Sequence, residues 1–351
     1  MDANVGLIRG DDRYTNVTQA LEQVADQIVF EGRRQVLVKP NLVGRRQLSA
    51  THFDALRAVL DFVRARYAGP VLLAEGAAME NTWESFAHFG YEKLVESHKV
   101  TLVDLNADET VAVQVYDRHL RPLRLRLART AVESDLRISV GPPKTHDAVI
   151  VTLSIKNMVM GCLVNASVAE RAPTPEAPPR PTLLGVLASL TPRWVRNTAL
   201  SQWAMTRMAA NSPSDKFAMH QSYPVINLNL ALIAPWVWPH VAVVDGFEAM
   251  EGDGPNAGDP VDWRIALAGT DALAVDTLTA RLMGFDPAEV GYLDYCKRLN
   301  LGVAAPERIG VTGNVTVEAA RRQFQPHPTY RQQRRWLLAD VDRLLQRASQ
   351  V

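Results

Sequence analysis

Residues 36–76 read VLVKPNLVGRRQLSATHFDALRAVLDFVRARYAGPVLLAEG, and this stretch decides the fold class. Residues 36–38 and 71–74 are short apolar runs typical of buried strands. Between them, residues 56–63 place four apolar side chains on one helical face, behind Thr51 as a candidate helix N-cap. A strand, a helix and a second strand in this order predict two parallel strands joined by a helical crossover.

The same alternation continues on both sides of this stretch. Further strands are expected at 5–8, 101–103, 136–140, 241–244, 263–268 and 309–311, a hairpin at 111–116 and 123–127, and helices at 17–28, 86–95, 271–283 and 337–345. The sequence therefore predicts a layered α/β fold with a mostly parallel sheet flanked by helices.

The chain divides by composition into four parts. Residues 1–164 and 216–315 carry the two halves of the α/β pattern, and residues 316–351 are expected to form a helical tail. Between the halves, residues 165–215 form a Pro/Trp-rich insertion, in which five prolines lie between 173 and 181. An inserted helical subdomain is the favoured interpretation of this segment, ahead of a mobile lid and, last, a membrane-surface contact.

Composition excludes several classes of protein. Lys and Arg total 38 and Asp and Glu total 38, which argues against a nucleic-acid partner. Cys162 and Cys296 are too few for a disulfide framework or a four-cysteine metal site. We find neither a signal-peptide pattern nor a long apolar span, so a cytoplasmic protein is expected. Oligomeric state is left open.

Polar residues follow five of the expected strands. Ligands of open parallel sheets bind at the carboxyl ends of the strands, so these residues are expected to converge on one crevice. Turn-forming residues are common in loops, which is the alternative explanation for each cluster alone. The clusters are Lys39-Pro40-Asn41, Glu75-Gly76, Asp104-Leu105-Asn106, Lys144-Thr145-His146 and Asp245-Gly246.

The cationic and imidazole side chains of these clusters suggest a chemistry. Lys39, Lys144 and Lys156 suit a carboxylate or phosphate ligand, and a lysine with a lowered pKa could instead act as a base. His146 and His220 are the candidate acid–base or ligand groups, with His146 assigned to catalysis and His220 to substrate binding. Glu75 is a candidate catalytic partner, and Asn41 and Asn157 are candidate substrate ligands.

A second, acidic group lies at residues 245–259. Asp245, Glu251 and Asp253 are candidate ligands of a divalent cation such as Mg²⁺, although their spacing differs from that of an EF-hand. A hydrated turn is the competing interpretation. Asp276 lies between apolar neighbours and is expected to form a salt bridge with a lysine or arginine.

Taken in order, these motifs resemble a known family. They continue with Ser154-Ile155-Lys156-Asn157 and Gly161, Glu251-Gly252-Asp253-Gly254-Pro255 and Thr270-Asp271-Ala272-Leu273-Ala274-Val275-Asp276. The set resembles the domain-of-unknown-function family numbered 362 over residues 36–285. Membership implies an α/β fold but no agreed reaction. Many members carry a cysteine-rich ferredoxin-like module that this chain lacks, so no iron–sulfur cluster is expected. A looser likeness to the lactate racemase family does not extend to that family's nickel chemistry, because its histidine set does not match here residue by residue.

These observations favour an enzyme acting on a small anionic molecule by lysine and histidine acid–base chemistry. The sequence contains no dinucleotide-binding, Walker, nucleophile-elbow or His-Glu-x-x-His motif. Proton transfer and metal-assisted hydrolysis both fit the candidate residues. A redox enzyme with a separate electron carrier and a non-catalytic binding protein are the alternatives.

Overall fold

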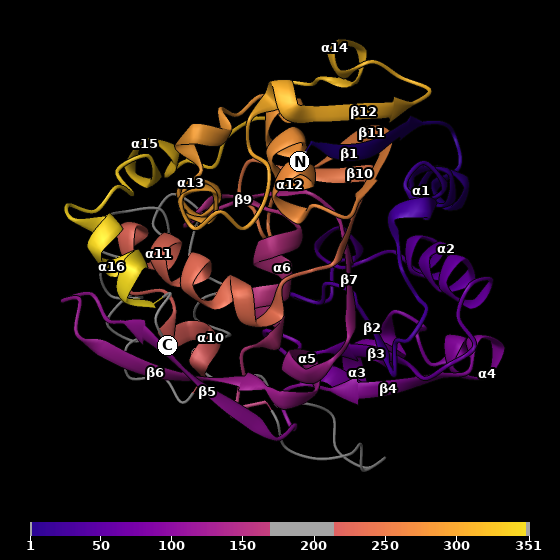
Figure 1. Ribbon diagram of the computed structural model, residues 1–351, viewed down its shortest axis with the longest axis horizontal. Coiled ribbons are helices and arrows are strands. Elements are labelled where there is room, and N and C mark those ends of the chain that lie inside the picture. Colours follow the sequence, from indigo (N-terminus) through magenta and orange to yellow (C-terminus); the bar gives the residue numbers. More distant parts are fainter. Residues whose placement is uncertain (1, 169–213, 349–351) are drawn as a thin grey trace.

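The computed structural model describes residues 2–168 and 214–348 and is built around one mixed, mostly parallel sheet with helices on both faces (Figure 1). The strand order is β12-β1-β11-β10-β7-β2-β3-β4. The short strand β8 pairs with β10, and β9 pairs with β8. The strands are β1 (Ala3–Arg9), β2 (Val36–Lys39), β3 (Val71–Glu75), β4 (Val100–Asp104), β7 (Leu136–Gly141), β8 (Lys144–His146), β9 (Ile150–Thr152), β10 (Val241–Glu251), β11 (Asp259–Gly269) and β12 (Ile309–Gly313).

Strands from both halves of the chain lie in this one sheet. The segment β10-β7-β2-β3-β4 is parallel, and β11 runs antiparallel to β10 and β1. The fold class expected from the sequence is confirmed. The expected hairpin is also present, as the separate two-stranded sheet of β5 (Thr110–Tyr116) and β6 (Pro122–Ala128).

The helices cover the two faces of the sheet. One layer contains α1 (Arg13–Glu22), α2 (Phe53–Arg64), α3 (Thr82–His88) and α4 (Lys93–His98). The other layer contains α6 (Ser154–Cys162), α11 (Tyr223–Ile233), α12 (Ala272–Leu282) and α13 (Gly291–Arg298). Shorter helices are α5 (Arg129–Glu133), α10 (Asp215–Ala218), α14 (Val317–Ala320), α15 (Tyr330–Gln333) and the last, α16 (Val341–Ala348).

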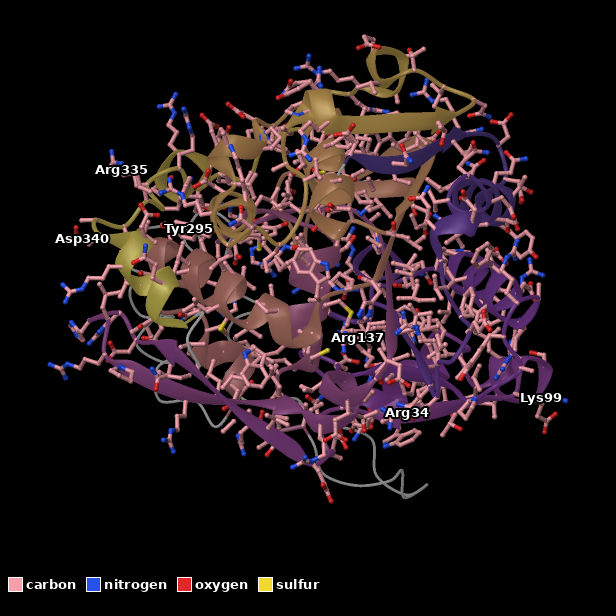
Figure 2. The ribbon with its side chains drawn as sticks, in the orientation of Figure 1. Arg34, Lys99, Arg137, Tyr295, Arg335 and Asp340 are labelled. Carbon is pink, nitrogen blue, oxygen red and sulfur yellow. The ribbon has the colours of Figure 1, made fainter. Side chains whose placement is uncertain are left out.

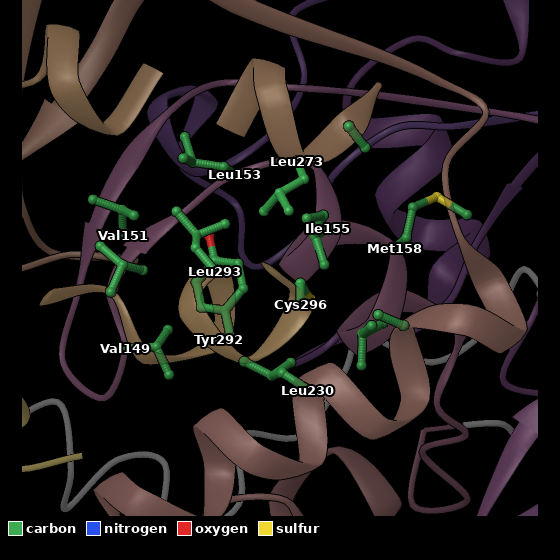
Figure 3. Close-up of a cluster of buried hydrophobic side chains, with 14 of the residues drawn as sticks. Val149, Val151, Leu153, Ile155, Met158, Leu230, Leu273, Tyr292, Leu293 and Cys296 are labelled. Atoms are coloured by element: carbon green, nitrogen blue, oxygen red, sulfur yellow. The ribbon is translucent and has the colours of Figure 1, made fainter. Parts of the chain in front are cut away.

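Alternation along the strands divides the core in two. Val36 and Val38 pack in the cluster beneath α1 and α2, whereas Leu37 packs in the cluster of α6, α11 and α12. Figure 3 shows the second cluster, where Leu153 and Ile155 from the start of α6 lie near Leu273 of α12.

Charged side chains lie mostly at the periphery, with a few buried exceptions. Figure 2 shows Arg34 and Lys99 at the edge of the molecule and Arg137 in its interior. Arg137 donates to the carbonyls of Ala131, Val132 and Ser134 at the end of α5, which explains its burial. None of the helices within 2–168 and 214–348 is long and apolar enough to cross a bilayer.

Most of the Pro/Trp-rich insertion predicted at 165–215 lies outside the described residues. Its predicted role as a helical subdomain, and with it the four-part division of the chain, stays a prediction.

Candidate functional site

The polar ends of β2 and β3 meet in a buried network. The Nζ of Lys39 donates to Oε2 of Glu75 (2.6 Å), to Oδ1 of Asn157 (2.9 Å) and to the carbonyl of Pro40 (3.0 Å). Burial raises the pKa of Glu75, against the lowering influence of the Lys39 and Lys216 ammonium groups. The predicted convergence of Lys39 and Glu75 is therefore present, and both side chains are directed at protein atoms.

Lys144 joins the same network from β8. Its Nζ donates to Oδ1 of Asn41 and to the carbonyl of Ser49 (2.9 Å), and Nδ2 of Asn41 donates to Oδ1 of Asn157 (3.0 Å). Burial, with the positive charge of Lys156 added, lowers the pKa of Lys144 to about 7. The structure thus brings five sequence-predicted residues into one hydrogen-bonded unit: Lys39, Asn41, Glu75, Lys144 and Asn157.

The other two polar clusters have local partners. Asp104 accepts from Oγ1 of Thr82 (2.6 Å) and from the N–H of Asn106 (2.9 Å) at the end of β4. Asp245 forms an ion pair with Arg13 (3.3 Å) on the side of the sheet covered by α1.

A small cavity adjoins the network at the carboxyl ends of β2 and β7. Its lining includes the polar residues Asn41, Ser139, Thr152, Ser154 and Asn157, beside the apolar Leu153 and Val243. The hydroxyls of Thr152 and Ser154 are buried and have no hydrogen-bond partner. Such orphaned hydroxyls suit a water molecule or a polar group of a ligand.

Helix α6 carries the central residues of the site and is held at both ends by buried charges. At its start, the carboxylate of Asp276 accepts the N–H groups of Ser154 and Ile155 (both 2.9 Å). At its end, the Nζ of Lys216 donates to the carbonyls of Met160 (2.8 Å), Gly161 (3.1 Å) and Leu163. Opposite charges at the two ends complement the helix dipole and fix the helix in place.

The predicted salt bridge between Asp276 and a lysine or arginine was wrong. Its carboxylate meets backbone N–H groups instead of a lysine or arginine side chain, because α12 directs it at the first turn of α6. Burial raises the pKa of Asp276 to about 7, although the N–H groups that it accepts work in the opposite direction.

Lys156 differs from the other buried lysines. It is 5% exposed, yet its Nζ makes no hydrogen bond or ion pair with any described residue. Burial lowers its pKa to about 8, and the negative charge of Asp147 limits this fall. A buried amine with no partner is costly to the fold, so its presence needs an explanation beyond stability.

Two histidines accompany Lys156. The rings of His146 and His220 lie 6.5 Å apart at an interplanar angle of 21°. Nδ1 of His220 donates to the carbonyl of Lys216 (3.1 Å), which leaves Nε2 as an unprotonated acceptor. Burial lowers the pKa of both histidines, to about 3 for His146, so both rings are neutral near pH 7.

Nδ1 of His146 has two competing neighbours. It accepts the N–H of Ala148 (3.0 Å) and lies 2.9 Å from Oδ1 of Asp147. The first contact requires an unprotonated Nδ1 and the second favours a protonated one, so the surroundings of His146 support both states of the ring. Burial favours a protonated Asp147, but His146, His220 and His327 outweigh this effect and lower its pKa.

The turn that carries His146 and Asp147 is fastened by the C-terminal segment. The amide of Gln333 donates to the carbonyl of His146 (2.8 Å) and accepts the N–H of Ile150, and Oγ1 of Thr329 donates to the carbonyl of Asp147 (2.9 Å). Ile150 has a φ of +67°, which is strained for a β-branched residue. Backbone strain of this kind is concentrated at functional sites.

Sequence reasoning missed this second set. Asp147 directly follows His146, and that adjacency was the available signal. His327, Thr329 and Gln333 lie far along the chain in a segment with no recognisable pattern, and the signal that connects them to the site is tertiary.

The predicted carboxylate cluster for a divalent cation is not assembled. Asp245 is paired with Arg13, Glu251 accepts the N–H of Gln325 (2.9 Å), and Asp253 contacts Nε2 of His327 (3.1 Å). Across 2–168 and 214–348, no group of three or more His, Cys, Asp or Glu side chains is arranged to hold a metal ion. Each acid is held by a local partner instead.

Fold and site together define an α/β protein with a buried lysine–histidine group at one edge of a parallel sheet. The chain belongs to the domain of unknown function family DUF362, whose model matches residues 36–281.

Two known proteins are similar to it. A thylakoid-associated protein of Synechocystis sp. is 23% identical over 276 residues, which cover 78% of this chain and 70% of that protein. The lactate racemase apoprotein of Thermoanaerobacterium thermosaccharolyticum superposes with a TM-score of 0.43 at 13% identity. That match covers 84% of this chain and 56% of the racemase, so the chain spans little more than half of the racemase's length.

Proposed function

We propose that this protein is an enzyme that moves a proton on a small anionic molecule at the group formed by Lys156, His146 and His220. The observation that carries the proposal is the buried side chain of Lys156, 5% exposed, whose Nζ makes no hydrogen bond or ion pair with the described residues. A carboxylate or phosphate oxygen would supply the missing partner and offset the cost of burying the charge.

The two imidazoles would have different roles. Nε2 of His220 is the general base, because Nδ1 is already committed to the carbonyl of Lys216. His146 is the electrophilic hydrogen-bond donor, because an Nδ1 that accepts from Ala148 places the ring proton on Nε2, which can donate to an oxygen of the ligand. Asp147, 2.9 Å from Nδ1, lies on the opposite side of the ring from this proton.

Access to the group is consistent with a small ligand. Lys156 and His146 are almost fully buried, whereas His220 is half-buried and the side chain of Asp147 is 41% exposed. A ligand would therefore approach past His220 and Asp147 and meet Lys156 at the inner end. The saturated network of Lys39, Lys144 and Glu75 would support the site by fixing Asn157 and α6.

Deuterium incorporation from D₂O tests this proposal. Small 2-hydroxy, 2-oxo and phosphorylated acids are incubated with the protein, and exchange at carbon is followed by NMR. Substitutions His220→Gln and His146→Gln should each slow exchange by about 10²–10⁴-fold. His119→Gln, on the exposed turn of the β5–β6 hairpin, is the matched control and should leave the rate unchanged. Equal rates in His220→Gln and the wild type, or no exchange with any of these acids, would overturn the proposal.

A further inference from the structure

Four lysine side chains are buried, and Lys156 differs from the other three in its hydrogen bonding. Lys39 and Lys216 each donate to three oxygen atoms, and Lys144 donates to two. An ammonium that is bound in this way has no lone pair to offer. Lys156 makes no such bond to the described residues, so its nitrogen is the one among the four that is free to react.

The position of Lys156 is fixed although its nitrogen is free. It lies in the first turn of α6, whose first two N–H groups are held by Asp276 and whose final carbonyls are held by Lys216. Leu153 and Ile155, on either side of the start of the helix, are buried in the apolar core (Figure 3). The rigid backbone and the burial of the side chain favour the uncharged form of the amine.

We propose that Nζ of Lys156 forms an imine with small carbonyl compounds that carry an anionic group, of which 2-oxo acids are the simplest class. This inference rests on the proposed function, because the imine would be the means by which the proton transfer is made easier. The carbonyl meets the free nitrogen, and Lys144 supplies positive charge for the anionic group, since it lies close enough for the charge of Lys156 to lower its pKa.

The steps balance without an oxidant or reductant. The lone pair of Nζ adds to the carbonyl carbon, forming a C–N bond, and the electron pair of the C=O bond moves onto the oxygen, which accepts a hydrogen bond from Nε2–H of His146. The oxygen takes one proton from the nitrogen and a second from solvent and leaves as water, and a protonated, cationic C=N bond remains. Nε2 of His220 then removes a proton from the neighbouring carbon; the electron pair of that C–H bond forms a C=C bond, and the π pair of the C=N bond moves onto the nitrogen. Return of a proton and addition of water release the carbonyl compound and the free lysine.

Burial makes the required uncharged amine available at neutral pH. With a pKa of about 8, Lys156 is uncharged roughly 200–300-fold more often at pH 7 than an ordinary lysine. The exposed residues Lys93, Lys99 and Lys297 are therefore internal controls within the same chain.

Borohydride trapping tests the inference on the full chain. The protein is incubated with pyruvate at pH 7, reduced with sodium borohydride, digested and mapped by mass spectrometry. We expect one reduced pyruvate adduct on Lys156, formed at least tenfold faster than on Lys93, Lys99 or Lys297. Lys156→Arg should retain its circular dichroism spectrum and lose this adduct. Equal labelling of all lysines, or labelling in which Lys156 is spared, would overturn the inference.

The two experiments distinguish a failure of the imine inference from a failure of the proposed proton transfer. Deuterium exchange that depends on His220 and persists in Lys156→Arg would refute the imine and leave the proposed function standing. An adduct on Lys156 without exchange dependent on His220 would support imine formation and refute the proton transfer.

Discussion

Gly161→Ala is predicted to destabilise the protein strongly, although the substitution adds only one methyl group in a helix. A Cβ at residue 161 would overlap Cε and Nζ of Lys39 and would lie 2.5 Å from Oε1 of Glu75. Lysine tips usually move aside at little cost, but this one is held by Glu75, Asn157 and the carbonyl of Pro40. The methyl group must therefore break the buried Lys39–Glu75 ion pair.

The structure gives the size of the effect. Breaking a buried ion pair costs about 3–5 kcal/mol, and alanine gains about 1 kcal/mol over glycine in a helix. The free energy of unfolding should thus fall by about 2–4 kcal/mol. Urea denaturation followed by circular dichroism measures it as a lower midpoint with an unchanged slope.

Gly44→Ala is the matched control for this prediction. A Cβ at residue 44 would meet its neighbours at 3.6 Å and 3.8 Å, which are ordinary contacts. A Gly161→Ala protein as stable as Gly44→Ala would refute the packing of Lys39 and Glu75 against α6.

Three further predictions concern the residues around α6. Burial lowers the pKa of Lys156 from 10.5 to about 8, so the native state is penalised below pH 8 and the penalty disappears above pH 10.5. Lys156→Met should therefore raise the free energy of unfolding at pH 7 by up to about 3 kcal/mol, seen as a higher urea midpoint. A lower free energy of unfolding would contradict a Lys156 amine without a partner. The raised pKa of Asp276 means that its protonated form stabilises the native state below pH 4 and that this contribution is lost as pH rises to about 7. The wild type should therefore lose free energy of unfolding relative to Asp276→Asn between pH 5 and 7 in urea titrations, and a relative gain over this range would show that the carboxylate is the favoured form. Gln333→Ala should slow deuterium exchange about 10–100-fold by releasing the turn of His146, while the exposed neighbour substitution Gln332→Ala should not; equal rates in both would refute the positioning role.

Much of the fold follows from local patterns in the sequence. Short apolar runs such as 36–38 and 71–74 are strands because they are buried on both faces, and the amphipathic stretch between them is a helix with one buried side. The meeting of Lys39, Glu75 and Lys144 follows from the rule that parallel strands present their carboxyl ends at one edge.

The rest depends on partners that no local pattern encodes. Asp245 pairs with Arg13 from α1, and Asp253 contacts His327 from the C-terminal segment. These acids, which were predicted to bind one cation, therefore each contact a different side chain. Asp276 was expected to need a cation, but the first turn of α6 offers it two N–H groups. The reason that Lys156 stands apart from Lys39, Lys144 and Lys216 is likewise tertiary, because all four are lysines in apolar surroundings.

The protonation state of His220 tests the central claim most directly. The pKa of the ring is lowered by desolvation, and its neutral form is expected to carry the proton on Nδ1 and leave Nε2 free, because Nδ1 donates to the carbonyl of Lys216. An ordinary histidine would be about three-quarters protonated at pH 6. Long-range ¹H–¹⁵N NMR of histidine-labelled protein, assigned with His220→Gln, reads the state of each ring nitrogen. The account predicts that His220 is less than three-quarters protonated at pH 6 and that its neutral form carries the proton on Nδ1; a ring at least as protonated as an ordinary histidine, or a neutral form with its proton on Nε2, would contradict it.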